Sequence, residues 1–232
     1  MIPPNPSCNL CGGTNFNRLF ELKGKRLLTC ISCGLTTFSP LPGRAELVRF
    51  YQEGDYFSSP YFQLADEEAQ TSHFRRFRSV ADLLKGALAP EEIVLEVGPG
   101  RGTFLRMLLD RGMRAEALEL SPRAAHRLGQ SLSFPVVAGE LENHPFSPER
   151  FAAVTAFDVL EHCLDPKEWL RAAWRVLRPG GVLALSTVNI DNLLDRLGKL
   201  FHRMGFRGPL TRLYPLFHLY YGSSANRVGK FC

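Results

Sequence analysis

The chain has 232 residues, of which 45% are hydrophobic and 22% are charged, and its formal net charge is +5. This composition is typical of a soluble globular protein with enough apolar residues for a sizeable core. No apolar run approaches the roughly 20 residues that a membrane span needs, and the N-terminal segment lacks the pattern of a secretory signal. We therefore expect a cytoplasmic protein.

Residues 1–40 form a head that is rich in cysteine and glycine. Two C-x2-C pairs, each followed by glycine, supply four thiolates with the spacing of a tetrahedral zinc site: Cys8, Cys11, Cys30 and Cys33. Residues 15–28 between the pairs have a turn signal at Lys23-Gly24-Lys25 and are predicted to form a hairpin. The head is therefore predicted to be a zinc ribbon whose ion is structural, because four cysteines fill its coordination shell.

The next segment, residues 41–74, is predicted to be a helical connector, and the helical pattern continues to Gly86 and Pro90. Apolar runs then alternate with helical patterns. The expected strands are residues 91–97, 114–120, 134–140, 151–160 and 182–188. The expected helices are residues 102–112, 121–128 and 166–181. This alternation predicts an α/β fold with a Rossmann-like, doubly wound and mostly parallel sheet, over residues 75–190.

The stretch "VLEVGPGRGTF", residues 94–104, follows the first of these strands. Gly98, Gly100 and Gly102 give G-x-G-x-G rather than the dinucleotide fingerprint G-x-G-x-x-G, and Glu96 would repel a pyrophosphate. An acid at this place suits a ligand that carries an ammonium group. Glu119 ends the next strand, where a carboxylate can accept hydrogen bonds from ribose hydroxyls. A ribose joined to a cationic amino-acid end describes S-adenosylmethionine.

Five blocks resemble, in order and spacing, the successive motifs of class I S-adenosylmethionine-dependent methyltransferases. The blocks are "VLEVGPGRGTFL", "ALELSP", "AGELENHPF", "FAAVTAFDVLEHCLDP" and "VLRPGGVLALSTVN", and "DVLEH" is typical of the small-molecule branch. The resemblance implies that Glu96 and the three glycines surround the methionine part of the cofactor. It also implies that Glu119 binds the ribose and that Glu140 and Leu141 lie beside the adenine.

The "DVLEH" segment would face the transferable methyl group in such a fold. We expect His162 to be the general base or to orient the acceptor, because its ordinary pKa lies near neutrality. Asp158 would line the cofactor pocket and Glu161 would hold the histidine tautomer; alternatively, Glu161 and His162 merely cap the next helix. Asp158, Glu161 and His162 also resemble an acid-x-x-Glu-His metal set of some O-methyltransferases, with His218 as a fourth ligand to a divalent ion.

Residues 191–232 form a basic, aromatic tail; residues 189–232 contain seven basic and two acidic residues, so the whole excess of positive charge lies there. Such a tail suits an anionic partner or a peripheral membrane contact, or it is a basic amphipathic helix packed on the domain. No final pair of strands is visible after residue 188. The chain is therefore expected to be truncated or to have an incomplete sheet, whose exposed edge favours an oligomer.

The predicted function is transfer of a methyl group from S-adenosylmethionine, with O-methylation of a small-molecule, lipid or sugar acceptor expected. One alternative is an RNA methyltransferase that docks through the zinc ribbon. Against it, the head is only weakly basic and has few aromatics for base stacking, so nucleic acid is not the expected partner. A second alternative is a non-catalytic protein that binds the cofactor or acts as a scaffold.

Overall fold

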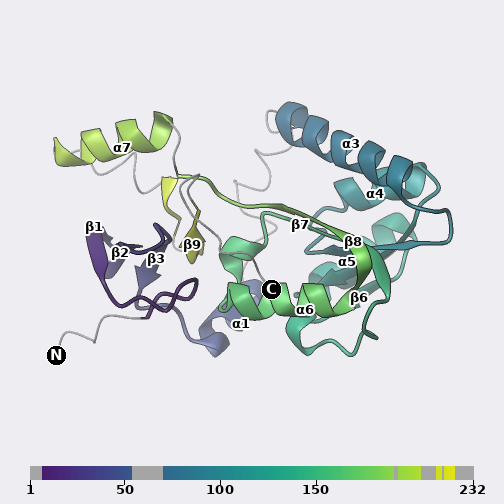
Figure 1. The fold of residues 1–232 in the computed structure, drawn as a ribbon, viewed down its shortest axis with the longest axis horizontal. Helices are drawn as coiled ribbons and strands as arrows, with labels where there is room; N and C mark the ends of the chain where they lie inside the picture. The colour runs from purple at the N-terminus through teal and green to yellow at the C-terminus, as the bar shows by residue number, and fades with distance from the viewer. Residues whose placement is uncertain (1–6, 54–69, 191–192, 205–212, 216, 223–232) are drawn as a thin grey trace. The chain divides into compact units, whose positions relative to one another are not determined.

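The computed structural model describes residues 7–53, 70–190, 193–204, 213–215 and 217–222, and Figure 1 shows their fold. Contacts divide the chain into two units. The first unit contains residues 1–42, 158–167 and 186–232, and the second contains residues 43–157 and 168–185. Each unit has its own sheet, and the cysteine-rich head shares its unit with segments from the middle and the end of the chain.

The second unit is built on a five-stranded sheet with the order β6-β5-β4-β7-β8. Its strands are β4 (Ile93–Val97), β5 (Arg114–Glu119), β6 (Val136–Ala138), β7 (Phe151–Phe157) and β8 (Leu177–Ser186). β4 pairs in parallel with both β5 and β7, and β5 pairs in parallel with β6. The predicted Rossmann-like α/β fold is confirmed.

Helices of the second unit share its apolar core with the strands of the sheet. They are α1 (Arg44–Glu53), α3 (Gln70–Ala87), α4 (Thr103–Asp110), α5 (Pro122–Leu132) and α6 (Pro166–Val176). Figure 1 shows α3 beside α4, and Ala81 and Leu84 of α3 share one buried cluster with Phe104 and Leu108 of α4. The same cluster includes residues of β4 and β7, so these two helices cover one face of the central strands.

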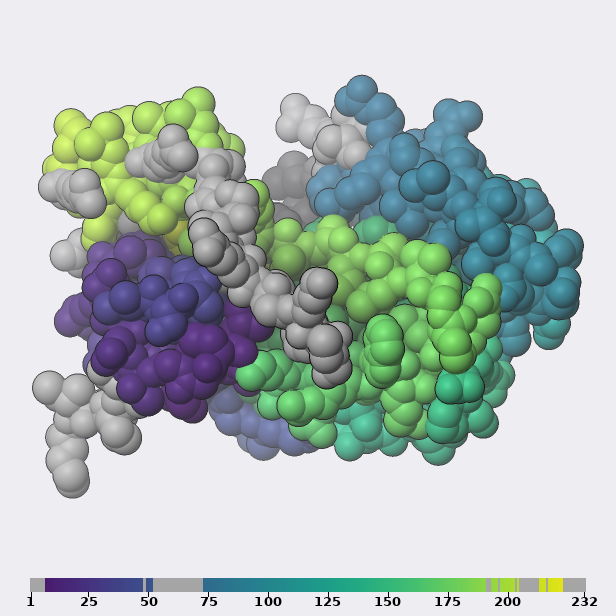
Figure 2. All heavy atoms as spheres, in the orientation of Figure 1, coloured from purple at the N-terminus to yellow at the C-terminus, as the bar shows by residue number. Residues whose placement is uncertain are grey.

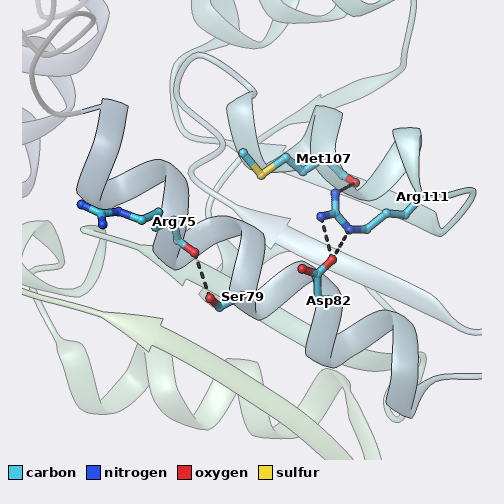
Figure 3. A network of polar contacts seen from close by, with 5 residues as sticks. All are labelled: Arg75, Ser79, Asp82, Met107 and Arg111. Carbon is cyan, nitrogen blue, oxygen red and sulfur yellow. Dashed lines mark hydrogen bonds and ion pairs between the residues drawn. The ribbon is translucent and has the colours of Figure 1, made fainter.

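A network of hydrogen bonds links α3 to Arg111, the residue after α4 (Figure 3). Nε and Nη2 of Arg111 donate to Oδ1 of Asp82 at 2.9 and 2.7 Å, and its Nη1 donates to the carbonyl of Met107 at 2.9 Å. In α3 itself, the Ser79 hydroxyl donates to the carbonyl of Arg75. The pair between Arg111 and Asp82 is partly exposed, so it orients the helices more than it stabilises them.

One predicted helix start is confirmed, and two predicted ends shift for local reasons. The hydroxyl oxygen of Ser121 accepts from the main-chain N–H of Ala124 at 3.3 Å, and a proline follows it at the first position of α5, as the sequence predicts. The helix predicted to reach residue 181 ends at Val176, three residues before Pro179, which disfavours helical backbone at its predecessor. The strand predicted over residues 151–160 ends at Phe157, because Asp158 has a positive φ of 56°.

The first unit is built on a four-stranded sheet with the order β1-β2-β3-β9. Its strands are β1 (Phe16–Leu22), β2 (Lys25–Cys30), β3 (Thr36–Ser39) and β9 (Tyr220–Tyr221), and all neighbours are antiparallel. Lys23 and Gly24 join β1 to β2 with φ values of 48° and 78°, as a two-residue hairpin turn requires. The predicted hairpin is therefore present.

The C-terminal segment contributes the fourth strand of this sheet. Thr36 and Thr37 of β3 pair with Tyr221 and Tyr220 of β9, and the hydroxyl of Thr37 donates to the carbonyl of Leu219 at 2.9 Å. This late strand therefore belongs to the sheet of the head and not to the parallel sheet. In the described part of the chain, β8 is the edge of that sheet, and its Val182 and Leu183 are more than one third exposed.

Helix α7 (Leu193–Arg203) turns large apolar side chains outward, and Figure 2 shows its atoms in yellow-green at the surface of the first unit. The exposed residues on and just after it are Leu193, Leu194, Leu197, Leu200, Phe201 and Met204. Its buried side includes Asp195, which accepts from the hydroxyl of Tyr214 and pairs with Lys199. None of the described helices is long and apolar enough to cross a membrane.

Candidate functional site

The glycine loop joins β4 to α4 in the second unit. Gly98, Gly100 and Gly102 have positive φ values of 67°, 54° and 73°, so all three adopt backbone that side chains disfavour. A Cβ at Gly102 would lie 2.6 Å from Cδ1 of Leu128 in α5. The third glycine therefore has a packing reason, namely the close approach of the loop to α5, in addition to any contact with a ligand.

Glu96 lies near the end of β4 with its carboxylate almost wholly buried, at 3% exposure. Its Oε2 has no hydrogen-bond partner among the described residues. Burial, together with the smaller effect of the charge of Glu119, raises the pKa of this carboxyl to about 8, although the main-chain N–H of Leu105 opposes the shift. A buried acceptor atom without a partner costs free energy until a donor, and best a cationic one, approaches it.

Glu119 lies at the end of the neighbouring strand β5 and is 7% exposed. Its Oε1 accepts from the N–H of Ser121 at 3.0 Å. Burial raises the pKa of Glu119, whereas main-chain N–H groups of Ser121, Gly100 and Leu120 lower it. This side chain therefore also interacts with the glycine loop. Because β4 and β5 are parallel and in register, Glu96 and Glu119 come from the same edge of the sheet.

Glu140 and Leu141 follow β6, the next strand in the same sheet. Oε2 of Glu140 pairs with the guanidinium of Arg44 and accepts from Nδ2 of Asn143 at 2.8 Å. The side chain of Leu141 is buried, at 1% exposure. The structure thus gathers the three acids predicted for the cofactor on the carboxyl side of three adjacent strands.

Asp158 begins the "DVLEH" segment, which belongs to the first unit. Its left-handed backbone is held from both sides: its N–H donates to the carbonyl of Ser186, and the Ser186 hydroxyl donates to its Oδ1, each at 2.9 Å. Such backbone costs free energy in residues other than glycine and is tolerated best by Asp and Asn. The turn directs the chain into the short 3-10 helix Leu160–His162.

Glu161, His162 and His218 lie together in the first unit, and one candidate ligand atom from each lies within 4.8 Å of the others. Glu161 is 1% exposed; its Oε2 accepts from the hydroxyl of Thr187 at 2.9 Å, and its Oε1 has no partner among the described residues. Asp158, predicted as a member of the same metal set, is not one of the three. Its charge nevertheless acts on both Glu161 and His162.

The tautomer of His162 follows from one hydrogen bond. Nδ1 lies 3.0 Å from the carbonyl of Phe217, and a carbonyl can only accept, so Nδ1 carries the proton and Nε2 the lone pair. The prediction that Glu161 holds this tautomer is therefore wrong, because the carbonyl of Phe217 does so. Burial lowers the pKa of His162 to about 4 and that of His218 to about 3, and it raises the pKa of Glu161 to about 7.

The four cysteines of the head converge on one point. All four Sγ atoms lie within 4.8 Å of one another, with Cys8 and Cys33 at 3.6 Å and Cys11 and Cys30 at 3.5 Å. A tetrahedral ion with Zn–S bonds of about 2.3 Å places its sulfurs about 3.8 Å apart. The cluster is therefore compatible with zinc and with the predicted ribbon.

Both cysteine knuckles have the same turn. Gly12 donates its N–H to the carbonyl of Cys8 at 2.8 Å, and Gly34 donates to Cys30 at 2.9 Å. The two glycines have φ values of 75° and 77°. The repeated glycine after each C-x2-C pair therefore serves the left-handed turn that brings the second thiolate beside the first.

Three contacts at these sites had no sequence signal. They are the carbonyl of Phe217 at His162, the hydroxyl of Thr187 at Glu161, and the ion pair of Arg44 with Glu140. Each joins segments that are far apart in the chain, and only the fold brings them together.

Comparison with known proteins identifies the family of the chain. Residues 71–220 match the profile of a family described as a methyltransferase domain. The chain belongs to this methyltransferase family. Among the relatives is a malonyl-[acyl-carrier protein] O-methyltransferase of Pseudescherichia vulneris, 32% identical over 129 residues, which are 54% of this chain and 51% of the relative. Another is a ubiquinone biosynthesis O-methyltransferase of Pseudomonas fluorescens, 32% identical over 103 residues, with 41% and 44% of the two chains covered.

The methyltransferase chain spans about half the length of the curated relatives it matches. Among solved structures, a candidate sarcosine dimethylglycine methyltransferase from Galdieria sulphuraria superposes with a TM-score of 0.51 at 18% identity. The superposition covers 70% of this chain and 61% of the other. At this identity the likeness concerns the fold, which is the predicted class I architecture.

Proposed function

We propose that this methyltransferase transfers a methyl group from S-adenosylmethionine to an oxygen atom of a small-molecule acceptor. Family membership implies the cofactor, which supplies an electrophilic methyl group on a sulfonium. The named relatives are O-methyltransferases, which supports an oxygen acceptor and does not favour RNA. The observation that carries the proposal is the buried, unpartnered Oε2 of Glu96 beside a glycine turn.

In this proposal each acid of the second unit has a separate task. Glu96 ionises and accepts from the ammonium group of the cofactor, which supplies the donor that the described residues do not provide. Glu119 accepts from the ribose hydroxyls, and the turn at Gly98 and Gly100 lets the main chain approach the ligand. Glu140 and Leu141 lie beside the adenine end.

We assign the acceptor chemistry to the first unit. Methyl transfer from a sulfonium needs the nucleophile in line and, for a hydroxyl, its proton removed. The lone pair on Nε2 of His162 is fixed by the bond from Nδ1 to Phe217, and Glu161 and His218 lie against it. These three side chains together deprotonate or polarise the acceptor hydroxyl.

Calorimetry with S-adenosylmethionine tests the cofactor assignment. Glu96→Gln is expected to weaken binding by about ten- to a hundredfold, because a hydrogen bond to a charged group contributes about 1.5–3 kcal/mol. The control is Glu91→Gln, an exposed acid just before the same strand, which should bind like the wild type. Tight binding of NAD with no response to S-adenosylmethionine would overturn the proposal.

Turnover separates an enzyme from a cofactor-binding scaffold. His162→Ala is expected to bind S-adenosylmethionine normally and to lose at least about a hundredfold in methylation rate, the usual contribution of a positioned acid or base. Small hydroxylated acceptors are offered in parallel with RNA. Binding of the cofactor without turnover on any acceptor identifies a scaffold, and salt-sensitive RNA binding with RNA methylation identifies the other alternative.

A further inference from the structure

The cluster of Glu161, His162 and His218 has the composition of a metal site with one open position. It offers one carboxylate and two imidazoles, a ligand set that catalytic zinc sites use together with a water or substrate. Around a tetrahedral ion with bonds of about 2.0–2.1 Å, donor atoms lie about 3.4 Å apart. The three candidate atoms lie within 4.8 Å of one another, so modest side-chain rotation brings them to an ion.

Two atoms of this cluster are buried without partners in the described part of the chain. They are Oε1 of Glu161 and Nδ1 of His218. A buried carboxylate oxygen and a buried imidazole nitrogen that bond to nothing cost about 1–3 kcal/mol each. Both are ligand atoms for a divalent ion, whose binding would remove this cost.

The surroundings of the cluster resemble the outer shell of a metal site. Ligating histidines usually donate their second N–H to a carbonyl or carboxylate, and ligating carboxylates are hydrogen-bonded in turn. His162 donates from Nδ1 to the carbonyl of Phe217, and Glu161 accepts from Thr187 through the oxygen that is not the orphan. In addition, the N–H of Leu219, the residue after His218, donates to the carbonyl of Glu161 at 2.7 Å. This bond ties the two ligand segments together.

We propose that Glu161, His162 and His218 bind a divalent transition-metal ion such as Zn²⁺ and leave one position for a water or the acceptor oxygen. Mg²⁺ and Ca²⁺ prefer shells of oxygen, so two imidazoles select against them. The charge of Asp158 also acts on Glu161 and His162, so it adds a second negative charge in the neighbourhood of the cluster. The ion would lower the pKa of a bound hydroxyl and so replace His162 as its direct base.

Metal binding does not rest on the proposed function; only the role of the ion in methyl transfer does. The test uses the full chain, loaded with Zn²⁺ and freed of excess by gel filtration, with zinc per chain measured by mass spectrometry. The wild type is expected to carry two ions, one at each cluster. Glu161→Gln and His218→Ala are expected to carry one. His126→Ala, which removes an exposed histidine of the second unit, is expected to carry two.

A measurement of zinc affinity tests the same site with a variant that keeps all three proposed ligands. Thr187→Val keeps the shape of the side chain but removes the hydroxyl that orients Glu161, and it is expected to weaken binding of the second ion by about ten- to a hundredfold. A Mg²⁺ titration should not displace that ion. Wild type that carries a single zinc, or His218→Ala that keeps both, would overturn the proposal.

X-ray absorption on the wild type identifies the zinc ligands directly, so it tests the site even where the variants fail to fold. The zinc spectrum at a loading of one ion is expected to show sulfur ligands, and at two ions a mixture of sulfur with nitrogen and oxygen. Sulfur alone at the higher loading would exclude the site. Calorimetry with S-adenosylmethionine separates the two proposals: two zinc ions without cofactor binding would overturn the proposed function and leave the metal site standing.

Discussion

The strongest test of the cofactor site uses the pH dependence of stability and the substitution Glu96→Gln. Burial raises the pKa of Glu96 from the ordinary 4.5 of a glutamate to about 8. Between these two values the folded protein holds a proton on Glu96 that the unfolded chain has released. The stability that this protonated carboxyl contributes is complete below about pH 4.5 and is lost as the pH rises through about 8.

The magnitude follows from the size of the window. Each pH unit in which folded and unfolded states differ by one bound proton changes the free energy of unfolding by about 1.4 kcal/mol. Because the two pKa values lie near the ends of the range from pH 5 to pH 8, the proton difference is incomplete there, and the wild type should lose about 3 kcal/mol through Glu96 alone. Glutamine has no such proton, and its side chain keeps a carbonyl oxygen that can accept from the N–H of Leu105.

The assay is urea unfolding of both proteins at pH 5, 6, 7 and 8. Other groups titrate identically in the two chains, so the difference between their unfolding free energies isolates Glu96. We expect the unfolding free energy of Glu96→Gln, measured relative to that of the wild type, to rise by about 3 kcal/mol from pH 5 to pH 8. Saturating S-adenosylmethionine should reduce that gain, because it binds the ionised carboxylate of the wild type. Parallel pH profiles for the two proteins would refute the reasoning.

Three further predictions concern backbone and metal. Gly102→Ala should lower the free energy of unfolding by about 2–4 kcal/mol, because Gly102 has a positive φ and the new Cβ would lie 2.6 Å from Cδ1 of Leu128. Gly86→Ala in α3 is the control: the new methyl group would meet open space, so the free energy of unfolding should rise by up to about 1 kcal/mol. Urea unfolding measures both changes. Asp158→Gly and Asp158→Ala both remove the carboxylate, so they differ only in how well the backbone adopts a φ of 56°. The glycine variant should be more stable than the alanine variant by about 1–2 kcal/mol, because glycine adopts this φ without strain. Equal stability of the two variants would contradict a backbone role for Asp158. Cys30→Ser should lose the zinc of the head and lower the melting temperature; unchanged metal content and stability would refute the ribbon.

The sequence predicts those parts of the fold that depend on local pattern. The apolar runs at β4, β5 and β7 mark buried parallel strands, Ser121 caps α5 as expected, and the spacing of the four cysteines predicts their convergence. Each of these signals is carried by residues close together in the chain. The same holds for the turn at Lys23 and Gly24.

The remainder depends on contacts between distant segments, which no local pattern encodes. The two tyrosines of β9 pair with β3, although they lie near the far end of the chain. This pairing, with the bond from Leu219 to Glu161, holds His218 beside Glu161 and His162. Resemblance alone indicates His218 as a ligand, whereas the strand of the head that fixes its place has no signal in the local sequence.

Glu96 and Glu161 share one property that distinguishes them in the described part of the chain: each is a buried carboxylate with one oxygen that has no partner. Each unpartnered oxygen costs free energy until a donor or a cation approaches it, and the surroundings of the two acids select different cations. Glu96 lies beside a glycine turn and a second acid, with no imidazole among the groups that shift its pKa, which suits an organic ammonium. Glu161 lies against two histidines, whose nitrogens bind a metal ion better than they bind an ammonium. Because the two acids belong to different units, each cation should stabilise its own unit, and the two effects on unfolding should be separable.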